Sequence, residues 1–251
     1  MNLSALVITK NEATHIGTCL ESIQFADEIV VVDSGSTDKT TTIAEKLGAR
    51  VMVHPFEDFA KQREFTASQA HGRWILFIDA DEVVTKELKE EILETIQSAD
   101  TSHVGFRIPR SNYYFGKIPW PAKEKQPRLF LRTALTGWHG AVHETPVVKG
   151  TIGDLQSFLV HYTHDDLTSM TAKTNQWSLI ESALLYKTHH PSMQWWRFLR
   201  IMLTKFVDSY VRQSGWRAGT AGLIESIYQG FSYFIVYAKL WEKQLHHPDK
   251  R

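Results

Sequence analysis

Acidic side chains stand where an apolar run ends in the stretch "WILFIDADEV", residues 74–83. Asp79, Asp81 and Glu82 lie close enough in sequence to repel one another unless a positive group lies between them. An aspartate pair suits a hard divalent cation such as Mg²⁺ or Mn²⁺, which prefers oxygen ligands and keeps waters and phosphates in its shell. The alternative is a pair of solvated acids that open the next helix, where the helix dipole favours negative charge.

Two earlier stretches add polar residues of the same kind. "TKNE" contains Asn11 and Glu12, and "DSGSTDKT" begins with Asp33. If both stretches follow parallel strands, these residues converge with Asp79 at the sheet edge where α/β proteins bind ligands. The alternative for the second stretch is a plain turn, with residues 34–37 supplying turn residues and a cap for the next helix. Neither a G-x-G-x-x-G nor a P-loop pattern follows the first apolar run, which argues against dinucleotide oxidoreductases and P-loop enzymes.

The elements that must position these residues alternate along the first hundred residues. Short β-branched runs predict strands, and apolar residues at helical spacing predict helices between them. The predicted strands are 3–8, 28–32, 50–53 and 74–78. We expect Gly48 to end the second helix, residues 59–71 to form the third, and Thr85 to cap a fourth. This alternation predicts a mostly parallel, Rossmann-like sheet flanked by helices.

The pattern changes twice farther along the chain. Short strand candidates separated by Gly and Pro occupy residues 103–110, 128–132 and 141–148, which indicates a mixed extension of the sheet. Helical spacing returns from residue 167. We therefore expect a nucleotide-type half at residues 1–100, an acceptor-type half of the same domain at 101–165, and a C-terminal helical extension at 166–251.

Composition limits the class of protein. The chain has 251 residues, 43% of them hydrophobic, with 28 basic and 28 acidic residues, so no net charge draws it to nucleic acid. Its one cysteine, Cys19, excludes an internal disulfide framework. No signal peptide and no long uninterrupted apolar window are found in the sequence, so the expected location is cytoplasmic.

Several motifs resemble family 2 glycosyltransferases of the GT-A fold. The resemblance rests on "ALVITKNEATHIGTCLESI", "EIVVVDSGSTDKTTTIAEKLGARV" and "GRWILFIDADE", in this order and spacing. Farther on, "QPRLFLR", "GWHGAVHE" and "HYTHDD" resemble the lipopolysaccharide-core branch of the family, the β-glucosyltransferases that act on inner-core heptose. The resemblance implies metal-dependent, inverting transfer of a hexose from a nucleotide sugar, UDP-glucose above all, to a lipid-linked saccharide.

The resemblance also implies roles for individual residues. The nucleoside would be held by the residues around the first two strand ends, the ribose or metal by Asp79, and the metal that bridges the diphosphate by Asp81. The donor-binding positions carried over are Thr9, Asn11, Glu12, Asp33, Arg63, Asp79, Ala80, Asp81 and Arg128. One position departs from the family pattern, because Glu64 follows Arg63 where the family commonly has Asn.

Transfer also needs groups that handle charge and protons. Arg63 and Arg128 are candidates to stabilise the diphosphate leaving group, together with the metal. Glu144 is the candidate base for the acceptor hydroxyl, the alternative being a polar turn before a proline. His161 or His164 is a candidate to complete the metal or diphosphate shell, the alternative being an ordinary hydrogen-bonded histidine at a strand end.

The helical tail between residues 187 and 217 carries six basic residues and a single acid, Asp208, interleaved with Trp and Phe. This mixture is typical of an interfacial helix on anionic lipid and predicts peripheral binding to the inner membrane. The alternative is an amphipathic helix whose aromatic face packs on the sheet.

Other functions share some of these features. "DADEV" also fits the D-x-D-x-[TV] pattern of haloacid-dehalogenase-type phosphatases, in which the first aspartate is a nucleophile. That pattern normally ends the first strand of its domain, whereas here three predicted strand and helix units precede it. A nucleotidyltransferase would want a basic, glycine-rich loop after the first strand. A non-catalytic glycan-binding or membrane-binding module of the same fold is the alternative that is not an enzyme.

Overall fold

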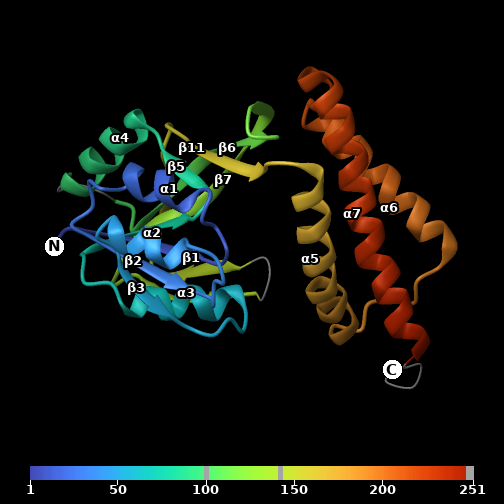
Figure 1. Cartoon of the computed structure of the whole chain (residues 1–251), viewed down its shortest axis with the longest axis horizontal. Helices are drawn as coiled ribbons and strands as arrows, with labels where there is room; N and C mark the ends of the chain where they lie inside the picture. The colour runs from blue at the N-terminus through green and yellow to red at the C-terminus, as the bar shows by residue number, and fades with distance from the viewer. Residues whose placement is uncertain (99–101, 141–143, 247–251) are drawn as a thin grey trace. The chain divides into compact units, whose positions relative to one another are not determined.

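The computed structural model describes residues 1–98, 102–140 and 144–246 (Figure 1). Its α-helices are α1 Ile16–Ser22, α2 Thr40–Lys46, α3 Phe59–Ser68, α4 Lys86–Gln97, α5 Leu167–Lys187, α6 Trp195–Val207 and α7 Gly219–His246. A short π-helix, η1 Asp208–Arg212, and a 3₁₀ turn, η2 Gly215–Ala218, join α6 to α7. The strands are β1 Leu3–Thr9, β2 Glu28–Asp33, β3 Arg50–Val53, β4 Trp74–Asp79, β5 Glu82–Val84, β6 Gly105–Tyr114, β7 Ile118–Leu131, β8 Leu135–His139, β9 Thr145–Val148, β10 Ile152–Asp154 and β11 Leu159–His164.

Four parallel strands form one half of the main sheet in the order β3-β2-β1-β4, as the alternation predicts. All seven residues of β1 are buried, which suits a central strand covered on both faces. In the register of these strands, Thr9 lies opposite Asp33, and Ile8 lies opposite Asp79. The carboxyl ends of β1, β2 and β4 therefore meet at one edge.

The other half of the sheet is mixed and continues in the order β7-β6-β11-β5. β7 pairs antiparallel with β4, β11 pairs antiparallel with β5, and β10 pairs parallel with β6. β8 and β9 form a separate antiparallel pair. Residues 105–110 of the first strand candidate lie in β6, and residues 128–131 of the second lie in β7. The last residues of the candidate at 141–148 form β9; residues 141–143 lie outside the described residues.

Helices cover both faces of the parallel strands. On one face, α1, α2 and α4 contribute buried side chains that include Leu20, Ala44 and Ile92. On the other face, α3 and the β8-β9 pair pack against Phe77 and Phe130 through Ala60 and Trp138. Burying two apolar faces at once explains why the strands read as near-continuous apolar runs.

The predicted helix ends are confirmed at two places and wrong at a third. The Thr85 side chain accepts a hydrogen bond from the Leu88 amide at 3.2 Å and caps α4. Gly48 has a φ of 80° just after α2, the left-handed conformation that ends a helix at low cost. The predicted cap from residues 34–37 is not formed, because α2 begins after Lys39 without a side-chain cap.

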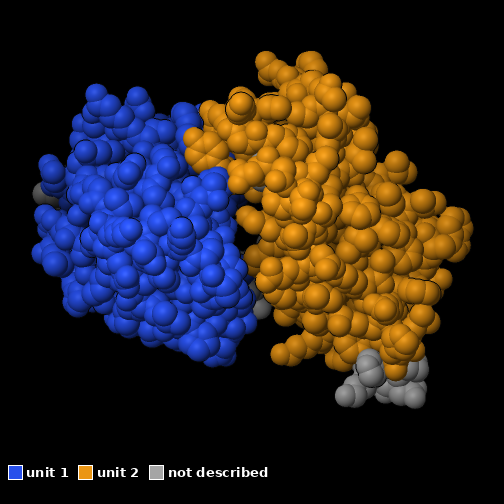
Figure 2. Space-filling model, viewed as in Figure 1, with its two compact units in different colours: residues 1–111, 123–161 blue, residues 112–122, 162–251 orange. Residues whose placement is uncertain are grey.

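The chain divides into two compact units (Figure 2). Unit 1 comprises residues 1–111 and 123–161, and unit 2 comprises residues 112–122 and 162–251. In unit 2, α7 packs against both α5 and α6 (Figure 1). Within the described ranges, none of the helices is long and apolar enough to cross a membrane.

Candidate active site

The ends of β1 and β2 are joined by a set of polar contacts. Asp33 is buried and accepts hydrogen bonds from the amides of Gly35 and Ser36, at 2.9 and 2.8 Å. Asn11, whose φ is 55°, accepts from the Thr37 amide at 2.8 Å, and its own amide donates to the Ser36 hydroxyl at 2.7 Å. The turn after β2 is thus fixed to the loop after β1.

Two more predicted residues lie at this edge. The amide of Glu12 donates to the Thr40 hydroxyl at 2.8 Å at the start of α2. Thr9 is 5% exposed, and its buried hydroxyl has no hydrogen-bond partner among the described residues. A buried hydroxyl without a partner is costly and is common where a ligand supplies the missing bond.

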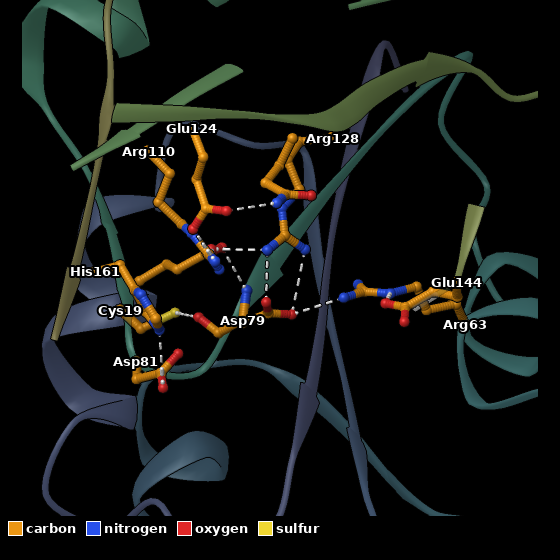
Figure 3. Close-up of polar contacts among 11 residues, drawn as sticks. Cys19, Arg63, Asp79, Asp81, Arg110, Glu124, Arg128, Glu144 and His161 are labelled. Carbon is orange, nitrogen blue, oxygen red and sulfur yellow. Dashed lines mark hydrogen bonds and ion pairs between the residues drawn. The ribbon is translucent and has the colours of Figure 1, made fainter. Parts of the chain in front are cut away.

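Asp79, the first acid of the D-x-D motif, is bound by two arginines (Figure 3). Arg128 reaches both of its carboxylate oxygens, at 2.5 and 3.3 Å, and Arg63 donates to one of them at 3.0 Å. Burial alone would raise the pKa of Asp79, but the charges of Arg128 and Arg63 outweigh it and hold the pKa well below its ordinary value. Asp79 is therefore a permanent anion in the working pH range.

Glu82 extends this network in a way that the sequence did not suggest. It lies in β5 and is fully buried, whereas a helix-opening acid would be exposed. Its carboxylate accepts from the Asp79 amide at 2.9 Å, from Arg128 at 2.7 Å and from Arg110 at 3.2 Å. Arg110 also contacts Glu124, because its Nε donates a hydrogen bond to the Glu124 carboxylate at 3.0 Å. Three contacts to one buried carboxylate fix the turn that presents the D-x-D motif.

Arg63 joins the D-x-D motif to the candidate base. Its Nε donates to Glu144 at 2.7 Å while another nitrogen contacts Asp79 (Figure 3). The guanidinium is 5.5 Å from the ring centroids of both Phe77 and Trp138, so aromatic faces fix its position. Its Nη1 is buried and has no partner within the described part of the chain.

Asp81 faces a different partner. Its carboxylate lies 3.4 Å from Nε2 of His161, and both side chains are mostly buried, at 17% and 12% exposure (Figure 3). His161 is placed there by β11, in whose register it lies opposite Glu82. Ala80 between the two acids is buried as well. The two aspartates of the motif therefore have separate surroundings, one with arginines and one with a histidine.

The same geometry bears on a metal ion. Within the described residues, no group of three or more His, Cys, Asp or Glu side chains stands close enough together to hold one. Asp81 and His161 form a pair of an oxygen and a nitrogen donor. Mg²⁺ and Mn²⁺ sites often use one or two carboxylates and take the remaining ligands from phosphate and water, so the Asp81 carboxylate fits such an ion.

Two neighbouring residues have structural contacts only. Glu64, at the position that departs from the family pattern, accepts from the Trp138 amide at 3.0 Å and so attaches α3 to β8. Cys19 lies 3.5 Å from the Asp79 carbonyl oxygen; burial, followed by the nearby acids, raises the pKa of its thiol well above the ordinary value. A thiol kept neutral in this way is unreactive.

The network is larger than the set of predicted residues. The structure brings together Asp79, Arg63, Arg128 and Glu144, and separately Asp81 with His161. It adds Glu82 and Arg110, which come from β5 and β6, two strands that are not neighbours in the sheet. Glu82 directly follows the D-x-D motif, but nothing in the sequence indicates its arginine partners, and only the sheet order reveals that they meet.

Comparisons with known proteins identify the family of this chain. The family model described as glycosyl transferase family 2 matches residues 4–150. The lipopolysaccharide core biosynthesis glycosyltransferase LpsC of Rhizobium meliloti is 29% identical over 96% of this chain and 92% of its own length. A glycosyltransferase of Rickettsia bellii is 31% identical over 97% of this chain and 87% of its own length.

Among solved structures, glucosyl-3-phosphoglycerate synthase from Mycobacterium tuberculosis, in complex with Mn²⁺, UDP and phosphoglyceric acid, matches with a TM-score of 0.49. It is 17% identical and covers 76% of this chain and 80% of that one. The GT-A fold class expected from the sequence is confirmed, and the phosphatase and non-catalytic alternatives are set aside because the matched family is one of transferases. The chain is a glycosyltransferase and belongs to glycosyl transferase family 2.

Proposed function

We propose that this enzyme transfers a hexose, glucose from UDP-glucose, to a lipid-linked saccharide such as the inner-core heptose of lipopolysaccharide. The acceptor class is supported by the name of the relative LpsC, which aligns over almost the whole chain. The observation that carries the chemistry is the separation of the D-x-D acids, with Asp79 held by arginines and Asp81 beside His161.

The nucleoside is assigned to the ends of β1 and β2. Thr9, Asn11, Glu12 and Asp33 line this edge, and the unpaired Thr9 hydroxyl is a donor ready for a ligand. Asp79 and Ala80 continue the same edge at the end of β4 toward the ribose. This arrangement follows the general rule that open α/β sheets bind ligands beyond the carboxyl ends of their strands.

We assign the divalent cation, Mg²⁺ or Mn²⁺, to Asp81 with His161 as its second protein ligand. Asp79 is the weaker of the two aspartates for this purpose, because two guanidinium groups already neutralise it. When bound, the cation supplies positive charge to the diphosphate that leaves. Arg63 adds to this charge through its unpaired Nη1, and Arg128 through its buried, unpaired Nε.

Glu144 is proposed as the base. Inversion requires the acceptor hydroxyl to attack the anomeric carbon from the side opposite the leaving diphosphate, in one displacement. A carboxylate within hydrogen-bond distance of that hydroxyl removes its proton as the new bond forms. The 2.7 Å contact from Arg63 orients Glu144 and ties its position to the D-x-D motif.

A lipid-linked acceptor also implies where in the cell the enzyme acts. We propose that the enzyme acts at the cytoplasmic face of the inner membrane, as a peripheral protein that binds no nucleic acid. The basic and aromatic residues of α6 support this placement.

The test is transfer of radiolabelled hexose with UDP-, GDP- and dTDP-sugars, with and without Mg²⁺ or Mn²⁺. We expect metal-dependent activity with UDP-glucose, and a loss of at least about a hundredfold in Asp81→Asn, because a metal ligand is removed. Glu90→Gln, an exposed acid on α4, is the matched control and should keep full activity. Near wild-type transfer by Asp81→Asn would contradict the metal assignment, and preference for GDP- or dTDP-sugars would contradict the donor.

A further inference from the structure

An exposed apolar row runs along α6 and into η1. Trp195, Leu199, Leu203, Val207 and Val211 recur at every fourth residue, with 74, 56, 64, 44 and 56% of their surface exposed. Residues four apart are neighbours on a helix surface, so these side chains form one continuous strip. We call these five residues the α6 stripe.

The α6 stripe is separate from the side of α6 that packs on α7. That packed side includes Phe198, whose ring lies 5.7 Å from the ring of Phe234, and Met202, whose carbonyl oxygen approaches Gly230. Ser209 continues it with a 3.0 Å hydrogen bond to Ser226. Since other side chains already make the α6–α7 contact, the exposure of the stripe is not explained by helix packing within unit 2.

Exposed apolar side chains are concentrated in unit 2. Among the described residues, every large apolar side chain with high exposure belongs to this unit except Met1 and Val53. Contiguous apolar surface of this kind is uncommon on soluble domains and usually marks a place where something binds.

The charges beside the α6 stripe identify the kind of partner. From Trp195 to Ala218 the chain carries five basic residues and one acid, Asp208, which lies 3.6 Å from Arg212. Arg197 and Arg200 lie over the ring of Trp196, at 5.3 and 5.2 Å from its centroid. Arginines stacked on an exposed tryptophan beside an aliphatic row combine charge for lipid phosphates with apolar surface for acyl chains.

We propose that the α6 stripe is a membrane-docking surface that lies flat on a bilayer rich in anionic lipid. The aliphatic and Trp side chains would enter the region between headgroups and acyl chains, and the flanking arginines would contact lipid phosphates. The proposed function supplies the reason for such docking, because a lipid-linked acceptor is held in a membrane.

A second copy of this chain is a poorer partner for the same surface. In a two-fold symmetric dimer each patch meets its own counterpart, so the arginines of one copy would face the arginines of the other. The residues from Trp195 to Ala218 offer only Asp208 as compensating charge. An anionic bilayer meets the same arginines with opposite charge along the whole stripe.

The test is co-sedimentation of the full chain with vesicles of phosphatidylcholine alone or with added phosphatidylglycerol, without donor or acceptor. We expect binding to the anionic vesicles that weakens as salt rises. The double variant Leu199→Ser/Leu203→Ser should bind them about tenfold more weakly, because two apolar side chains no longer enter the bilayer. Leu179→Ser on α5 is the matched control, since Leu179 is also exposed, at 51%, and it should bind as the wild type does.

Arg197→Gln/Arg200→Gln separates charge from apolar contact. This variant should lose about tenfold in affinity for anionic vesicles and nothing for neutral ones. Absence of vesicle binding, equal losses in the Leu179 and Leu199/Leu203 variants, or a change confined to the self-association seen by analytical ultracentrifugation would overturn the proposal. Hydrolysis of UDP-glucose by the same variants should stay at the wild-type level, so failure of docking and failure of the proposed function give different results.

Discussion

At the scale of single residues, Asp79 of the D-x-D motif and the nearby Glu82 are stabilised by arginines that come from other elements. Arg63 comes from α3, Arg110 from β6 and Arg128 from β7. Burial lowers the pKa of Arg128, but the negative charges of Asp79 and Glu82 outweigh it and raise the pKa above its ordinary value, so Arg128 stays charged. The repulsion among neighbouring acids is therefore relieved by protein cations before any metal binds.

Replacing Glu144 by Gln tests the proposed base directly. Glutamine keeps the shape and one acceptor for Arg63 but cannot take a proton, so kcat should fall about a hundredfold or more. The affinity for UDP, measured by calorimetry, should stay within about twofold because the nucleoside contacts lie at other strand ends. Glu57→Gln, an exposed glutamate just before α3, is the control and should leave both quantities unchanged.

The opposite pattern would remove Glu144 from the chemistry. If Glu144→Gln mainly weakens UDP binding while kcat stays high, the residue acts only through Arg63, which it contacts at 2.7 Å.

Residue-level prediction from the sequence succeeds where a motif sits at a strand end. Asp79 and Asp33 were found because apolar runs stop there, and the register of β1, β2 and β4 places both at one edge. Glu82 was missed because an acid before a helix normally suggests a favourable dipole contact. Its actual surroundings depend on Arg110 and Arg128, whose positions follow from strand pairing and not from spacing in sequence.

At the scale of elements, the four strand and helix units follow from local patterns, whereas the later strands follow from them only in part. β5 and β10 are too short to show any alternation, and their places depend on partners elsewhere in the sheet. β7 runs from Ile118 to Leu131, whereas the sequence pattern predicts a strand only over its last residues, after the prolines and charged residues of 118–127. Pairing with neighbours overrides weak local preference in such strands.

A row of small residues brings α7 close to its neighbours. Gly222, Ser226 and Gly230 recur at every fourth position and are all buried. A Cβ at Gly222 would collide with the carbonyl oxygen of Gly215, and one at Gly230 would lie 3.0 Å from that of Met202. Small side chains are therefore required where α7 meets α6 and η2.

Gly222→Ala should destabilise unit 2 by about 2 kcal/mol or more, because backbone must move to admit the methyl group. Gly17→Ala in α1 is the control: the nearest atom to its added methyl group is a side-chain carbon at 3.7 Å, and alanine favours helix. Urea unfolding followed by circular dichroism should show a lower midpoint for the first variant only. Equal midpoints would mean that the α7 contact relaxes without cost.

At the scale of the whole molecule, buried acidic side chains have different surroundings in the two units. In unit 1, Asp79 and Glu82 are paired with Arg128, whereas Glu225 in unit 2 is fully buried and one of its oxygens has no partner among the described residues. Burial raises the pKa of Glu225 from 4.5 to about 7, and hydrogen bonds from Gln229 and Tyr114 offset this only in part. Glu225 therefore keeps its proton in the folded state at pH values where the unfolded chain has lost it.

This difference makes stability depend on pH in a defined window. Between pH 4.5 and about 7 the folded state binds more protons at Glu225, so the free energy of unfolding falls as pH rises and then levels off. The contribution is about 3 kcal/mol from the size of the shift. Asp79, whose pKa is lowered, titrates in stronger acid and acts outside this window.

Glu225→Gln should remove this fall in the free energy of unfolding with rising pH. Glu242→Gln, at an exposed residue of the same helix, should keep it. Urea unfolding at pH 5 and pH 8 measures both variants against the wild type. A wild-type-like fall in Glu225→Gln would show that another group is responsible.

The strands β6 and β7 pass through both units, which limits how the protein can be dissected. Residues 112–122, at the tips of these strands, belong to unit 2, where Trp120 donates to Gln213 at 3.0 Å and its ring lies against Gly215. A recombinant fragment that starts at residue 162 would lack this tryptophan, and a fragment that stops there would carry the strand tips without the helices they contact. No single cut in the chain therefore yields two intact units. A chimera that takes unit 2 from a homologue would need two separate inserts from it, one for the strand tips and one for the C-terminal helices.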